Sequence, residues 1–276
     1  MKIIKKAVLP EGFKANGVFC GLKKSGKPDL ALIHSERPAI AGCMFTTNKI
    51  LAAPVILCKE HLKKNKVYHS IIANSGNANC FTGAPGLADA RKMSVAASDE
   101  LGVTPSSVLV FSTGIIGKRL DVRKITSAVP GLSKGLSAQG IHKAKKAIMT
   151  TDTFAKEVSS VCVIGGKKIT VCGIAKGSGM IGPNMATMLA FILTDADISQ
   201  MCLDAALKRV VNKTFNCVTV DGCMSTNDSV VVLANGASRN KRITQGQDAL
   251  LFEKALEAVC LALAKMLAAD GEGATK

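Results

Sequence analysis

The residues with the clearest chemical potential lie between Gly173 and Asp197, in the stretch GIAKGSGMIGPNMATMLAFILTDAD. Glycines at 177, 179 and 182 allow positive φ and close backbone approach, which favours a loop that presents a ligand or a reactive bond. Ala186 and Thr187 follow this loop. A threonine becomes a nucleophile with its own α-amine as base only if the bond before it has been cut. Self-cleavage between Ala186 and Thr187 is therefore one interpretation, and a threonine buried in a strand is the other.

The same glycines permit a second chemistry. Residues 177 to 182 match G-x-G-x-x-G, the dinucleotide fingerprint, which requires a strand before it and a helix directly after it. Residues 168 to 174 alternate as a strand does, but residues 185 to 193 are apolar on every side and favour a short buried strand over a helix. Dinucleotide binding is therefore the weaker interpretation.

The block from Lys176 to Ala196 resembles the autoprocessing signature of the ornithine acetyltransferase, or glutamate N-acetyltransferase, family of arginine biosynthesis. Other blocks also resemble that family and occur in the family's order. They are Asn74–Asn79, Ser112–Gly117, Met149–Thr153, Ser225–Asp228 and Asp270–Thr275. Six ordered blocks across most of the chain are far more specific than any single motif, and they favour Thr187 as a nucleophile.

The resemblance implies roles for particular residues. The hydroxyl of Thr113 and the amide of Gly114 would form the oxyanion site, where the run Val108–Ser112 alone predicts a strand that ends in a loop. Thr150 would contact substrate. Lys176 would bind the substrate carboxylate and Glu272 the substrate amino group, with Thr187 as both nucleophile and substrate contact.

The resemblance also implies a reaction and an architecture. Acetyl would pass from N-acetylornithine to Thr187 and then to glutamate, without a cofactor, with acetyl-CoA as a possible further donor. The fold would be α/β (α+β), an autoprocessing threonine-nucleophile fold with mixed sheets covered by helices. Segments 1–186 and 187–276 would stay associated, as a heterotetramer of two alpha and two beta segments. The alternatives are a self-cleaving aminopeptidase or amidase and an inactive truncated fragment of the family.

Composition excludes several other classes. The chain has 276 residues, 47% hydrophobic content and a formal charge of +16, but its basic residues are scattered, Trp is absent and Tyr occurs once, so no nucleic-acid platform is predicted. No apolar run approaches the roughly 20 residues of a membrane span, and the basic start lacks a signal peptide's apolar region. Ten cysteines without a C-x-x-C pair predict neither a metal site nor a disulfide scaffold. These features indicate a cytoplasmic protein without a membrane or nucleic-acid partner.

Periodicity predicts the elements around the blocks. Strands are expected at 30–33, 40–45, 67–73, 108–112, 158–163, 168–174, 218–220 and 229–233, with turns at 36–38 and 74–79. Helices are expected before Gly102, over 121–148 with breaks at Pro130 and near Gly140, after an N-cap at Ser199, and over about 247–269.

Two departures from the family pattern carry expectations. Cys223 and Met224 stand where the family commonly has an aspartate and a threonine, which weakens the expected polar network of that loop. The family motif that starts at Asp270 is normally followed by a further strand-containing segment. We therefore expect a loosely held Glu272, an exposed apolar patch on the 247–269 helix, and weak or no acetyl transfer unless a second polypeptide supplies that strand.

Overall fold

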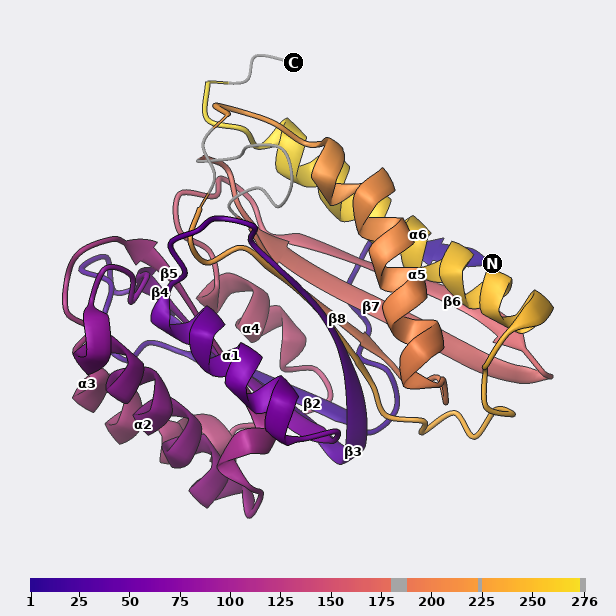
Figure 1. Ribbon diagram of the computed structural model, residues 1–276, viewed down its shortest axis with the longest axis horizontal. Helices are drawn as coiled ribbons and strands as arrows, with labels where there is room; N and C mark the ends of the chain where they lie inside the picture. The colour runs from indigo at the N-terminus through magenta and orange to yellow at the C-terminus, as the bar shows by residue number, and fades with distance from the viewer. Residues whose placement is uncertain (180–187, 223–224, 274–276) are drawn as a thin grey trace.

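The computed structural model describes residues 1–179, 188–222 and 225–273. Within them, helices and strands alternate in an α/β arrangement (Figure 1). The strands are β1 (Lys2–Ile4), β2 (Phe13–Val18), β3 (Leu30–Phe45), β4 (Tyr68–Asn77), β5 (Val108–Ile115), β6 (Lys156–Ile164), β7 (Lys167–Lys176), β8 (Leu189–Thr194) and β9 (Ser229–Ala234). The α-helices are α1 (Ala53–Lys64), α2 (Gly83–Leu101), α3 (Val122–Lys134), α4 (Ile141–Ala147), α5 (Gln200–Lys213) and α6 (Gly246–Ala269), and short 3-10 turns lie at Pro105–Ser107 and Phe215–Cys217.

The strands form a mixed sheet in the order β1-β6-β7-β8-β9-β3-β4-β5, with β2 added beside β3. The pairs β4/β5 and β8/β9 are parallel and the other pairs are antiparallel. β3 belongs to both halves of the sheet, because its first part pairs with β2 and β4 and its second part pairs with β9. The mixed sheet covered by helices that the sequence predicts is confirmed.

Apolar side chains of the two halves of the sheet meet in one core layer. Phe111 of β5 and Phe191 of β8 lie in the same buried cluster, with ring centroids 5.1 Å apart. A second cluster joins β4 and β5 to α1, α2 and α3, and a third joins β6 to β9 with α5 and α6. The result is a sandwich of two sheet layers with α1, α2 and α3 on one side and α5 and α6 on the other, while α4 packs into the core layer that holds Phe111 and Phe191 (Figure 1).

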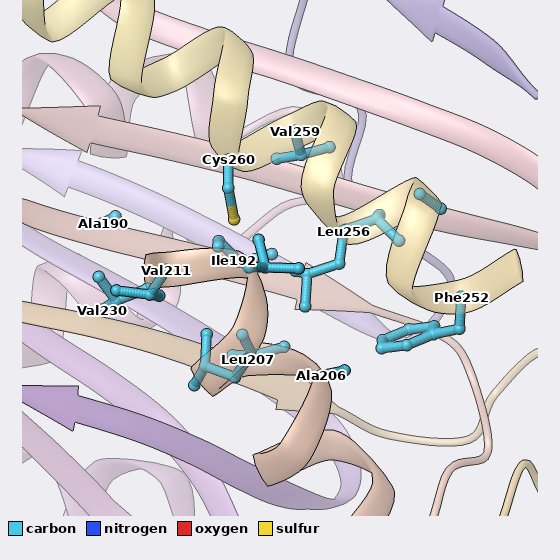
Figure 2. Packing of buried hydrophobic residues seen from close by; sticks show 14 of the residues in the cluster. Ala190, Ile192, Ala206, Leu207, Val211, Val230, Phe252, Leu256, Val259 and Cys260 are labelled. Carbon is cyan, nitrogen blue, oxygen red and sulfur yellow. The ribbon is translucent and has the colours of Figure 1, made fainter. Parts of the chain in front are cut away.

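α6 packs beside α5 over β6 and β7 (Figure 1). Figure 2 shows Phe252, Leu256, Val259 and Cys260 of α6 directed toward α5 and the sheet, and all four are buried. Leu250 is 55% exposed and Leu261 is 40% exposed. The sheet and α5 therefore cover the face of α6 that carries these four buried residues, whereas Leu250 and Leu261 remain exposed on the same helix, which agrees with part of the expected apolar patch.

Most expected elements are confirmed with extended bounds. The hairpin around Gly165 and Gly166 joins β6 to β7, and Ser199 caps α5 by accepting a hydrogen bond from the Cys202 amide. Gly102 ends α2 in the left-handed conformation. The predicted strand at 185–193 begins, in the described residues, as β8 at Leu189.

Several expectations are wrong. Residues 36–38 form no chain reversal but an irregularity within the continuous strand β3, where Pro38 cannot donate a ladder hydrogen bond. The turn cluster at 74–79 is strand β4 as far as Asn77, because β5 pairs with it. Pro130 lies inside α3, and residues 218–220 form no strand. Helix α1, which has Pro54 in its first turn, lies between the strands expected at 40–45 and 67–73, where the sequence predicts no helix.

Candidate active site

A cavity of about 880 Å³ opens where the two halves of the sheet meet at the ends of β4, β5 and β7. Each of the six sequence blocks contributes described residues to its wall. These residues are Gly76, Asn77, Ala78, Thr113, Gly114, Ile115, Ile116, Thr150, Thr151, Lys176, Gly179, Ser225, Asn227 and Glu272. Residues as distant in sequence as Gly76 and Glu272 therefore meet around one space.

Thr113 and Gly114 lie near the end of β5, and Gly114 is opposite Gly76 of β4. Gly114 has φ +130°, and a Cβ there would lie 2.5 Å from the Gly76 carbonyl carbon. Only glycine fits this conformation and this approach of two backbones. The absence of a side chain leaves the backbone beside Thr113 open to the cavity, as an oxyanion site requires.

A buried polar network holds this wall together. The Ser112 hydroxyl donates to the Asn74 side-chain oxygen at 2.6 Å, and the Asn74 amide group donates to the Asn77 carbonyl at 2.8 Å. Asn227 donates from its side-chain amide to the carbonyls of Ala78 at 2.7 Å and Ser112 at 2.9 Å. The block that contains Asn227 is thereby fixed to the ends of β4 and β5. The polar network of this loop persists in the described residues although Cys223 and Met224 lie outside them.

Lys176 is the last residue of β7, and only 3% of its surface is exposed. Burial lowers the pKa of its ammonium, while the nearby Asp152 carboxylate opposes that shift. The pKa of Asp152 is itself lowered: burial raises it, but Lys176, Lys156 and the Gly177 amide outweigh burial. The Lys176 ammonium therefore lies at the cavity wall with the Asp152 carboxylate as its counter-charge, and such a cation can bind a substrate carboxylate.

Glu272 follows α6 and is held against the loop after β7. Its amide donates to the Ser178 carbonyl at 2.6 Å, and the Ser178 hydroxyl lies 2.7 Å from the Thr151 hydroxyl. A Cβ on Gly179 would lie 2.7 Å from the Glu272 carboxylate, so the missing side chain makes room for that group. The expectation of a loosely held Glu272 is therefore wrong, because these contacts tie it to the cavity wall.

Asp228 is a buried carboxyl group immediately before β9. It accepts a hydrogen bond from the Met188 amide at 3.0 Å, and its second oxygen has no hydrogen-bond partner among the described residues. Burial raises the pKa of Asp228 to about 8, although the Met188 amide, Ser225 and Lys176 favour the charged form. The carboxyl is therefore largely protonated at neutral pH.

The structure brings together Thr113, Gly114, Thr150, Lys176 and Glu272, as the sequence predicts. Ala186 and Thr187 lie outside the described residues. Sequence reasoning missed Asn227 in the wall and the buried polar groups behind it, which are Asp152, Lys156 and Asp228. Asp152 and Asp228 stand within the recognised blocks, which is a signal for their importance. Lys156 gave no such signal.

The cavity rim is basic. Lys23, Lys24, Lys118, Arg119 and Lys124 line it, against the acidic residues Asp121, Asp221 and Glu272. Residues 1–179, 188–222 and 225–273 contain no group of three His, Cys, Asp or Glu side chains arranged to hold a metal ion. The helices in these ranges include none long and apolar enough to cross a membrane.

Solved structures define the class of protein first. The chain resembles the aminopeptidase/esterase/amidase of Ochrobactrum anthropi, described as a variant of the Ntn hydrolase fold, with a TM-score of 0.62 over 98% of this chain and 88% of that one at 10% identity. At that identity the likeness shows the fold alone. The fold is accordingly the Ntn-hydrolase-like α/β sandwich.

The particular family follows from closer matches. The sequence model of the ArgJ family matches residues 14–276, and this chain belongs to that family. It is 51% identical to the arginine biosynthesis bifunctional protein ArgJ of Caldanaerobacter subterraneus over 98% of this chain and 67% of the relative, and 46% identical to that of Bacillus licheniformis over 97% and 65%. The chain thus spans about two thirds of the length of these relatives.

Two solved structures of such proteins align with about two thirds of this chain. ArgJ of Bacillus halodurans aligns with a TM-score of 0.62 at 36% identity, over 67% of this chain and 98% of that one. Ornithine acetyltransferase of Mycobacterium tuberculosis, solved with ornithine, aligns with a TM-score of 0.60 at 35% identity, over 66% of this chain and 97% of that one.

Proposed function

We propose that this chain cleaves itself between Ala186 and Thr187 and transfers acetyl from N-acetylornithine to glutamate in arginine biosynthesis. The observation that carries the proposal is the convergence of all six family blocks on one cavity. Family membership supports the reaction class, and the ornithine bound to the Mycobacterium tuberculosis relative supports the substrate class.

In the proposed mechanism the Thr187 hydroxyl attacks the acetyl carbonyl and its freed α-amine accepts the proton. The Thr113 hydroxyl and the Gly114 amide donate to the oxyanion of the tetrahedral intermediate. That intermediate collapses to an acetyl-threonine ester as ornithine leaves with a proton. The amine of glutamate then attacks the ester, and acetylglutamate and free Thr187 result.

The remaining site residues bind substrate in this proposal. The Lys176 ammonium pairs with the substrate carboxylate, the Glu272 carboxylate pairs with its amino group, and Thr150, which also lines the cavity, contacts the substrate. Opposite charges on Lys176 and Glu272 suit N-acetylornithine, which carries a carboxylate and, because its α-nitrogen is acetylated, a free ammonium at the end of its side chain. The basic rim raises the local concentration of anionic substrate such as glutamate.

The two segments, 1–186 and 187–276, are expected to remain associated after cleavage. β8 pairs with β7, and β9 pairs with β3, so strands on either side of the proposed cut share hydrogen-bond ladders. α6 also packs on β6 and β7. We further propose a heterotetramer of two alpha and two beta segments, with no cofactor and a cytoplasmic location, which suits the nine free cysteines of the described residues.

A second use of the cavity is acetyl transfer from acetyl-CoA to glutamate. The relatives are named bifunctional, and the cations Lys23, Lys24 and Lys124 at the rim suit the phosphates of such a donor. Release of coenzyme A that depends on glutamate tests this use. A self-cleaving amidase would instead release free acetate when glutamate is omitted.

The decisive experiment is intact mass and terminal sequencing of the purified chain, followed by a transfer assay. Two pieces are expected, the second beginning TMLAFIL. Thr187→Ala should stay uncut, and Thr187→Ser should retain part of the cleavage because it keeps the hydroxyl. Transfer is assayed for this chain alone and with the remaining third of a relative supplied as a separate polypeptide. A folded chain that stays uncut would refute the proposal.

A further inference from the structure

The side chain of Asp152 is fully buried where three segments of the cavity wall meet. Its Oδ1 accepts hydrogen bonds from the Gly177 amide at 2.7 Å and from the Lys156 ammonium at 2.7 Å. Its Oδ2 accepts from the Thr150 amide at 2.9 Å. All three partners are donors, so an ionised carboxylate satisfies them, whereas an amide side chain would set one donor against another.

Lys156 extends this contact to the end of α6. Its side chain is 0% exposed, and its ammonium donates to Asp270 at 2.5 Å as well as to Asp152. Asp270 also accepts from the amide and hydroxyl of Thr153. Asp270 is the C-cap of α6, so its carboxylate lies at the negative end of the helix dipole. The neighbouring Lys156 ammonium stabilises negative charge at this place.

We propose that Asp152, Lys156 and Asp270 form one positioning unit for the substrate-binding groups of the cavity, called the buried triad below. Through Asp152 the triad holds the backbone directly after Lys176 and supplies the counter-charge that keeps Lys176 an ammonium. Through Asp270 it fixes the segment that carries Glu272. What Lys176 and Glu272 bind rests on the proposed function. The triad explains, in addition, how the charge of Lys176 and the positions of both residues are set.

The charges around Lys176 support this assignment. Burial lowers its pKa, and the strongest opposing influence is the Asp152 carboxylate. The other charged groups that act on it, or on which it acts, are Lys156, Asp228, Glu272 and Lys23. Asp228 is largely protonated below pH 8, so it supplies little counter-charge there. Loss of the Asp152 charge should therefore weaken the ammonium form of Lys176 most.

The first test reads Lys176 directly, by NMR titration of the folded protein with lysines labelled at Cε and the Lys176 signal assigned with Lys176→Arg. Asp152→Asn is expected to lower the Lys176 pKa by about one unit. Asp152→Glu keeps the charge, so the pKa should stay near that of the unaltered protein. Lys156→Met removes a repelling cation and should move the Lys176 pKa upward.

The matched control is Glu157→Gln. Glu157 follows Lys156 in β6 and pairs with the Lys145 ammonium, with side-chain exposures of 15% and 12%, but it is not part of the cavity wall. This variant should leave the Lys176 pKa unchanged. An unchanged Lys176 pKa in folded Asp152→Asn, or an equal shift in Glu157→Gln, would overturn the proposal. If Asp152→Asn does not fold, Lys156→Met becomes the test. The proposal requires a raised Lys176 pKa in that variant, and an unraised pKa refutes the triad.

The second test is kinetic. In Asp152→Asn the KM for N-acetylornithine and glutamate should rise about tenfold with a smaller change in kcat, and Asp152→Glu should recover part of the loss. Equal losses of kcat alone in both variants would contradict a positioning role. If the unaltered chain shows no transfer even when the remaining third of a relative is supplied, the proposed function fails, and the NMR titration still decides the triad on its own.

Discussion

Gly114 and Gly76 face each other across the parallel strands β5 and β4 so closely that a Cβ on Gly114 would lie 2.5 Å from the Gly76 carbonyl carbon. Both glycines have positive φ, +130° and +96°. The close approach makes the wall beside Thr113 a rigid backbone surface, and it explains why this corner of the cavity has no side chain to fill it.

Gly114→Ala should therefore damage the site twice, by backbone strain of about 1–3 kcal/mol and by forcing the two strands apart. Turnover should fall by at least tenfold, and the unfolding midpoint should drop. Gly117→Ala is the matched control, because Gly117 also has positive φ (+77°) but open space around it. Gly117→Ala introduces backbone strain alone, whereas Gly114→Ala adds the clash with Gly76. Urea unfolding and transfer rates are measured for both variants. Equal effects would show that the strand approach at Gly114 is unimportant.

Thr113→Ala should remove one donor aimed at the developing oxyanion. Losses of this kind run to about 2.7–4 kcal/mol, or roughly a hundredfold or more in kcat, with a smaller change in KM. Thr113→Ser keeps the hydroxyl and should recover most of the rate. Steady-state kinetics of the two variants measure this difference. A raised KM with unchanged kcat in Thr113→Ala would show that Thr113 binds substrate and does not stabilise the oxyanion.

Local periodicity was sufficient to predict the helices with strong caps or apolar faces. The long helix expected over 247–269 and the N-cap Ser199 depend on neighbours within a few residues, and both are found. Strand continuity was harder to predict. β3 runs through Pro38, and β4 runs on through Asn77, because partner strands from distant sequence supply the hydrogen bonds.

The residues of the site also differ in how well the sequence predicts them. The cavity-lining residues could be named because they stand in ordered blocks, and Thr113, Lys176 and Glu272 do meet. The triad could not be foreseen. Lys156 and Asp270 are 114 residues apart, and their contact depends on how α6 crosses β6 and β7. A buried lysine at a strand start has no sequence pattern of its own.

Leu256→Ala tests the packing of α6. Leu256 is fully buried between α6, α5 and the sheet (Figure 2), so its truncation should cost about 2–5 kcal/mol of unfolding free energy. Leu250→Ala on the same helix, at a side chain 55% exposed, should change stability by no more than about 0.5 kcal/mol. Urea unfolding measures both. Similar costs for the two variants would mean that α6 does not pack as described.

Asp228 predicts how stability depends on pH. Its pKa is about 8 in the folded protein and near the ordinary 3.8 in the unfolded chain. Between these values the unfolded chain has lost the proton that the folded protein keeps, so stability should fall as pH rises, by at most about 1.4 kcal/mol per pH unit. Above pH 8 this contribution is constant. The lowered pKa of Asp152 acts below that group's ordinary value, and the lowered pKa of Lys176 acts below 10.5, where it makes stability rise with pH. Both contributions are shared by Asp228→Asn and its parent, so they cancel in the comparison of the two.

The measurement compares Asp228→Asn with the unaltered residue, both in a Thr187→Ala background so that every sample is one uncut chain. The asparagine side chain of this variant cannot ionise and can still accept from the Met188 amide, so the variant should lack this slope. The stability of the Asp228→Asn variant relative to its parent should therefore increase steadily from pH 5 to pH 8 in urea unfolding. Asp197→Asn, at a carboxylate 43% exposed, serves as the control and should keep the parent's slope. Parallel stability curves for Asp228→Asn and its parent would show that Asp228 is ionised in the folded protein throughout this range.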